Sequence, residues 1–63
     1  MIISTESYEF AHGKRPRGYG LWAFKINGNL EFFQGTYGNT VKMAKKYARE
    51  ILRDNTAVIK VQP

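Results

Sequence analysis

Few side chains in this sequence belong to types that carry out covalent chemistry, and their spacing does not bring them together. The 63 residues include one histidine, five Asp and Glu, and no cysteine. His12 stands in a polar segment beside Gly13, and no carboxylate is placed to orient its ring. Glu6 and Glu9 lie three apart on an expected strand and would point to opposite faces. We therefore predict a protein that is not an enzyme and that holds no metal and no cofactor.

Cationic side chains are the chemistry that the sequence does offer. Ten Lys and Arg oppose five Asp and Glu, which gives a formal net charge of +5. One group lies in and just after the glycine-rich segment 11–20: Lys14, Arg15, Arg17 and Lys25. A second group is spaced along an expected helix: Lys42, Lys46, Arg49 and Arg53. Cations neutralise phosphates and release their counterions, so a nucleic acid is the expected partner.

The segments that position the first group are expected to form strands. Residues 2–10 are rich in β-branched and aromatic types and predict a strand, and residues 11–20 predict a loop. Residues 21–26 and 30–37 flank Asn27-Gly28-Asn29, which predicts a hairpin. A three-residue loop there would set Ile26 opposite Leu30. One face would then carry Trp22, Phe24, Ile26, Leu30 and Phe32, and the other Leu21, Ala23, Lys25, Glu31 and Phe33.

The second half of the chain predicts a helix followed by a strand. Residues 40–54 are expected to be helical, with Asn39 or Thr40 as the N-cap and Asn55 in a left-handed conformation at the end. The expected apolar stripe of this helix is Val41, Ala44, Ala48, Ile51 and Leu52. Residues 56–61 predict a strand whose inward side chains are Ala57, Ile59 and Val61. The predicted fold is one α+β domain over residues 1–63, a small antiparallel sheet in the order βββαβ with one helix packed on one face.

These expectations place a nucleic-acid-binding surface on the hairpin face that the helix leaves uncovered. Cations and aromatic rings alternate along this face and the loop before it, and a two- or three-stranded ribbon fits the major groove of DNA. The predicted contact residues are Lys14, Arg15, Arg17, Tyr19, Lys25 and Phe33. The basic helix face is a secondary candidate, although Glu50 and Asp54 dilute its charge and favour a solvated surface.

Residues 13–50 resemble the DNA-binding domain of the Apetala and ethylene-response-factor type, whose three-strand-plus-helix module also occurs in integrases. The segment from Gly13 to Ile26, the run Phe32-Phe33-Gln34-Gly35-Thr36-Tyr37, and Ala44, Tyr47 and Ala48 carry the likeness. The resemblance implies double-stranded DNA bound by the sheet rather than by the helix. Carried over position by position, it implies contacts from Arg15, Arg17, Tyr19, Lys25, Asn27 and Phe33. Two positions depart from the family: Glu31 stands where an arginine is usual and Leu21 where a lysine is common. The stretch PRGYGLWAF also resembles segments of small phage and mobile-element proteins.

Two alternatives use other surfaces. Residues 35–52 resemble the last strand and helix of double-stranded-RNA-binding domains, which would bind RNA through Lys42, Lys46 and Arg49. A small phage-type protein could instead dock on an acidic host protein through an exposed strand edge. The N-terminus has no secretory pattern, and the longest fully apolar run is four residues, Leu21 to Phe24. We therefore expect an intracellular, cytoplasmic protein, nucleoid-associated if it binds DNA, with no membrane partner. The sequence leaves the oligomeric state open.

Overall fold

A computed structural model describes all residues from Met1 to Pro63. The elements follow the order βαββαβ: β1 (Ile2–Ser4), α1 (Glu6–His12), β2 (Tyr19–Ile26), β3 (Asn29–Thr36), α2 (Tyr37–Glu50) and β4 (Val58–Val61). The four strands form one sheet in the order β1-β4-β2-β3. Strands β2 and β3, and β2 and β4, pair antiparallel, whereas β1 pairs with β4 in parallel. The fold is therefore α+β, as predicted, but its sheet is mixed and it has two helices.

The predicted strand over residues 2–10 is wrong beyond Ser4, because the chain turns into helix α1. The backbone N–H of Glu9 donates to the carbonyl of Thr5 at 2.9 Å and closes the first turn, and the Thr5 hydroxyl donates to the Glu9 carboxylate. Glu6 and Glu9 lie in the first turn, where the helix dipole favours negative charge. Gly13 ends the helix in the left-handed conformation, with φ of 69°.

The hairpin forms as predicted, but its loop has two residues rather than three. Asn27 and Gly28 both have positive φ, 49° and 86°, as a type I′ turn requires. Ile26 therefore pairs with Asn29 instead of Leu30, and Trp22 pairs with Phe33. This shift by one residue moves every side chain of β3 to the face opposite the predicted one.

Helix α2 starts and ends earlier than the predicted range of 40–54. Thr36 is the N-cap, and its hydroxyl accepts a hydrogen bond from the Asn39 N–H at 3.3 Å. The helix ends at Glu50, and Arg53 rather than Asn55 takes the left-handed conformation beyond it, with φ of 53°. Ile51, expected in the apolar stripe, is instead exposed, whereas Ala44 and Ala48 are fully buried as predicted.

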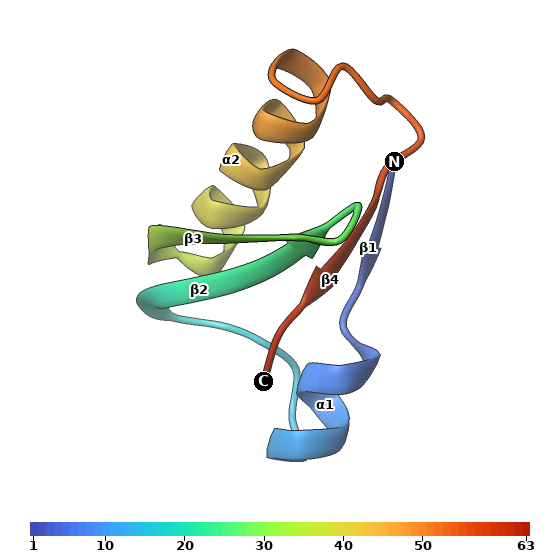
Figure 1. The fold of residues 1–63 in the computed structure, drawn as a ribbon. Coiled ribbons are helices and arrows are strands. Elements are labelled where there is room, and N and C mark those ends of the chain that lie inside the picture. The colour runs from blue at the N-terminus through green and yellow to red at the C-terminus, as the bar shows by residue number, and fades with distance from the viewer.

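The hydrophobic core lies between α2 and one face of the sheet. Its members come from β2, α2 and β4, together with the residue before β4: Trp22, Phe24, Ile26, Ala44, Ala48, Ala57, Ile59 and Val61. The inward direction of the last three was predicted and is confirmed. Helix α1 lies at one end of the sheet (Figure 1) and reaches the same side through Tyr8, whose ring lies 5.5 Å from that of Trp22. Both helices thus leave the opposite face of the sheet uncovered.

Candidate nucleic-acid interface

The uncovered face of the sheet carries apolar and aromatic side chains together with lysines. Along β2 and β3 the exposed fractions are 73% for Tyr19, 67% for Leu21, 53% for Leu30 and 56% for Phe32. The register sets Lys25 beside Leu30 on one side and beside Lys60 of β4 on the other. We call this surface the open face; its residues are Tyr19, Leu21, Ala23, Lys25, Leu30, Phe32, Gln34 and Lys60.

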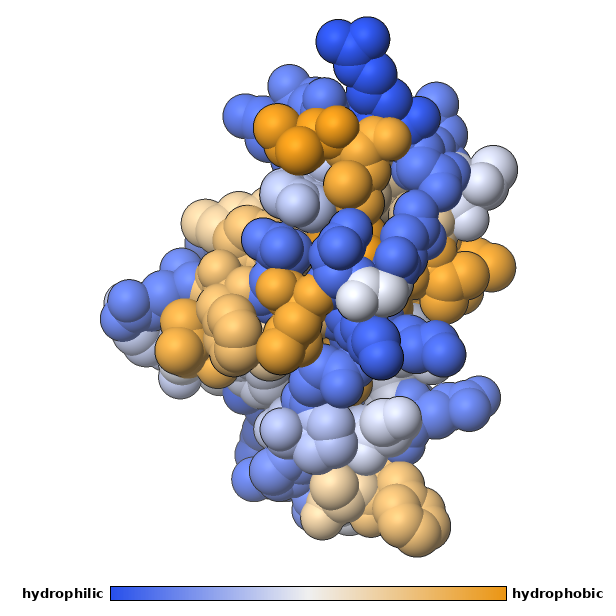
Figure 2. All heavy atoms as spheres, viewed as in Figure 1, coloured by the Kyte–Doolittle hydropathy of each residue, from blue (hydrophilic) through white to orange (hydrophobic).

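Apolar atoms gather over the region of β2 and β3, with hydrophilic atoms around them (Figure 2). Proteins seldom leave several large apolar side chains adjacent on one exposed surface unless that surface binds something. Leu21, Phe32 and Leu30 are neighbours across the two strands, because Leu21 pairs with Gln34, Ala23 with Phe32 and Lys25 with Leu30. The exposed apolar side chains of the open face therefore form one continuous patch rather than a set of scattered residues.

The basic loop leads directly into the open face. Residues 13–18 connect α1 to β2, and Lys14, Arg15 and Arg17 are all exposed there. Pro16, between the two arginines, is buried, so the loop is anchored at its centre. Its end is held by the carbonyl of Gly18, which accepts from the Trp22 indole N–H at 3.2 Å and from the Tyr37 backbone N–H at 2.9 Å. The backbone that carries these cations is thus held at its centre and at its end.

Tyr19 joins the loop to the open face. It is the first residue of β2, and its hydroxyl accepts a hydrogen bond from the Gln34 amide at 3.3 Å across the hairpin. This contact holds the phenol ring over the sheet next to the end of the basic loop. Lys14, Arg15, Arg17, Tyr19 and Lys25 therefore all lie exposed on the loop or the open face.

Phe33 does not lie on the open face, and this prediction is wrong. Its ring lies 6.1 Å from that of Phe24 and 6.4 Å from that of Tyr47, on the α2 side of the sheet. The cause is the two-residue turn, which places Phe32 on the open face instead. Recognising the Asn-Gly pair as a complete turn would have identified Phe32, and with it Leu30 and Gln34.

Asn27 lies in the turn at the far end of the hairpin, where its amide donates to Asp54 at 2.7 Å. Asp54 also accepts from the backbone N–H and hydroxyl of Thr56, at 2.9 and 2.8 Å. The hydrogen bonds from Thr56, followed by that from Asn27, lower the pKa of the Asp54 carboxyl. The Asn27 side chain thus already has a partner that connects the hairpin to the segment before β4.

The predicted secondary basic surface is shorter than expected. Lys42, Lys46 and Arg49 are exposed on α2, but Arg53 lies beyond the helix end and does not continue their line.

The titratable side chains outside the basic surfaces do not form a catalytic or metal-binding group. His12, the single histidine, stacks on Tyr8 with ring centroids 4.2 Å apart. Burial, and to a smaller extent the charge of Glu9, raises the pKa of the Tyr37 hydroxyl. No three of the His, Asp and Glu side chains are grouped as metal ligands would be.

Comparisons with family models, with curated proteins and with solved structures found no match. No helix of the fold is both long enough and apolar enough to cross a membrane.

Proposed function

We propose that this protein is a non-enzymatic double-stranded DNA-binding module that uses the basic loop 14–17 and the open face. The observation that supports the proposal best is that these two surfaces are continuous. The exposed cations of the loop directly precede Tyr19, and Tyr19 lies on the same face of the sheet as Lys25 and Lys60. In this proposal the β2–β3 part of the four-stranded sheet faces the major groove, where apolar side chains contact the thymine methyl group and arginine reads guanine.

The position of the terminal strands is compatible with this role. The three-strand-plus-helix domains that residues 13–50 resemble have no counterpart of β1 and β4, and such added strands would block binding if they lay over the sheet. Both strands instead extend the sheet sideways beyond β2. The added strand β4 contributes a further cation to the open face, Lys60, opposite Lys25.

The expected contacts divide into two kinds. Lys14, Arg15, Arg17 and Lys25 neutralise phosphates or reach base edges, and Tyr19, Leu21 and Phe32 supply apolar contact in the groove. If four cations neutralise phosphates, the logarithm of the association constant falls with the logarithm of salt concentration with a slope of about −3.6.

Binding of a short labelled DNA duplex, followed by fluorescence anisotropy over a series of salt concentrations, tests the proposal. The double variant Arg15→Ala/Arg17→Ala is expected to bind more weakly and to reduce the slope by about 2 units. The matched control is Lys42→Ala/Arg49→Ala, which removes the same charge from α2 and should keep most of the affinity. Equal losses in both variants would show non-specific attraction to net charge, and a larger loss in the control would favour RNA-type binding through the helix.

A further inference from the structure

Strand β3 is a free edge of the sheet and has no lysine, no proline and a single charged residue, Glu31. It is the last strand in the order β1-β4-β2-β3, so nothing pairs with its outer side. Native edge strands are commonly protected by lysine, proline or shortness. Strand β3 is eight residues long (NLEFFQGT), and of the ten Lys and Arg in the chain none lies in it.

The backbone groups on this edge belong to the residues of the open face. The N–H of Tyr37 bonds to Gly18 of the β2 side, and the N–H of Gln62 bonds to the carbonyl of Ala23. With the antiparallel register, these bonds direct the odd-numbered residues of β3 toward β2. The N–H and C=O groups of Leu30, Phe32 and Gln34 therefore point outward and are available to another strand.

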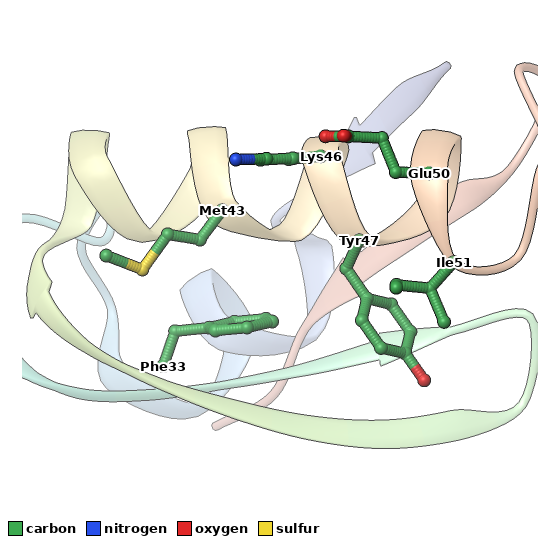
Figure 3. A pocket seen from close by; sticks show the side chains of 6 residues that line it. All are labelled: Phe33, Met43, Lys46, Tyr47, Glu50 and Ile51. Carbon is green, nitrogen blue, oxygen red and sulfur yellow. The ribbon is translucent and has the colours of Figure 1, made fainter.

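An apolar groove runs along the same edge, between β3 and α2 (Figure 3). It has a volume of about 310 Å³ and is lined by Phe33, Met43, Lys46, Tyr47, Glu50 and Ile51. Met43 lies at one end, Ile51 at the other, and Phe33 and Tyr47 lie between them. Ile51, the C-cap residue that follows α2, is 66% exposed. A free edge and an adjacent groove together form a surface suited to an added strand.

We infer that a second copy of this chain occupies this surface, through antiparallel pairing of β3 with β3 about a two-fold axis. The rim of the groove is complementary to itself. Lys46 and Glu50 lie four residues apart, so an antiparallel partner helix places Lys46 of one copy near Glu50 of the other. Met43 of one copy likewise meets Ile51 of the other. An acidic protein is a poor alternative occupant, because the only charge on β3 is Glu31.

The spacing of the elements fits this arrangement. Helix α2 contacts both β2 and β3. Strands in a sheet lie about 4.8 Å apart, so α2 and its mate would lie two strand spacings apart, about 10 Å. That separation is close to the usual packing distance of helices, about 8–10 Å. Pairing the outward groups of two β3 strands also keeps both open faces on one side of a continuous sheet.

Sedimentation equilibrium from micromolar to millimolar concentrations tests this inference, with circular dichroism to confirm that each variant is folded. The wild-type chain is expected to approach twice its 7.3 kDa mass. Gln34→Pro removes an outward N–H without touching the core, and is expected to give a monomer. Ile51→Lys is expected to weaken the dimer strongly. Leu21→Lys, on the open face at nearly the same exposure, is the matched control and should leave the dimer intact.

Charge reversal gives a second test. Lys46→Glu and Glu50→Lys should each weaken dimerisation, and the double variant Lys46→Glu/Glu50→Lys should restore most of it. A wild-type chain that stays monomeric at all concentrations would overturn the inference. Loss of the dimer in Leu21→Lys but not in Ile51→Lys would also overturn it, because the open face would then be the interface. These measurements contain no DNA and do not depend on the proposed function.

Discussion

Two neighbouring phenylalanines on β3 have opposite roles. Phe32 is more than half exposed on the open face, whereas Phe33 packs between Phe24 and Tyr47 under α2. Their separation follows from the alternation of side chains along a strand. One ring is therefore free to bind a ligand, and the other stabilises the fold.

Alanine substitutions should separate these roles. Phe32→Ala is expected to lower DNA affinity and to change the free energy of unfolding less than Phe33→Ala does, because more than half of the Phe32 surface is exposed. Phe33→Ala is expected to cost about 2 kcal/mol of stability, less than the loss of a fully buried ring, because Phe33 is only partly buried against the core. Denaturant unfolding and anisotropy titrations measure both quantities. Phe10→Ala, which removes an almost fully exposed ring from α1, is the control for Phe32 and should change neither. An unstable Phe32→Ala with unaltered affinity would contradict this assignment.

The elements differ in how far the sequence alone predicts them. Helix α2 is predictable because Ala44 and Ala48 fall on one face, and β4 because alternate residues, from Ala57 to Val61, are buried. Helix α1 is not, because its seven residues contain no buried side chain and so leave no apolar stripe. It depends instead on the Thr5–Glu9 contacts and the left-handed Gly13.

The length of the hairpin loop determines which side chains of β3 lie on the open face. The Asn27-Gly28 signal predicts the turn itself, but not whether Asn29 belongs to the loop or to the strand. The basic loop and Lys25 do not depend on this choice, whereas every position on β3 does. The cations of the candidate site and Tyr19 are therefore predictable from the sequence, whereas its β3 position falls on Phe32 instead of the predicted Phe33.

Asp54 links two elements, the β2–β3 turn through Asn27 and the segment before β4 through Thr56. Its pKa is lowered in the folded state, so its contribution to stability is present above the ordinary carboxyl pKa, about 4, and is lost as pH falls through the lowered value. Asp54→Asn should be less stable than wild type at neutral pH. The difference in unfolding free energy should shrink in acid, measured by denaturant unfolding across pH. A difference that stays constant down to strongly acidic pH would contradict this role.

In the molecule as a whole, the two faces of the sheet differ: one packs against α2, and the other is exposed. The α2 side of the sheet holds nearly all of the buried apolar surface, which a chain of 63 residues needs for stability. The other side remains open and continues into the basic loop. The β3 edge lies between these two sides, so a second copy could add there without covering either the open face or the loop.

The most direct test of the central claim is a map of backbone amide shifts on titration with duplex DNA. We expect the largest changes in loop 14–17 and on the open-face residues of β2 and β3, with Lys42, Lys45 and Arg49 of α2 nearly unchanged. Changes confined to α2, or no change at all, would contradict it.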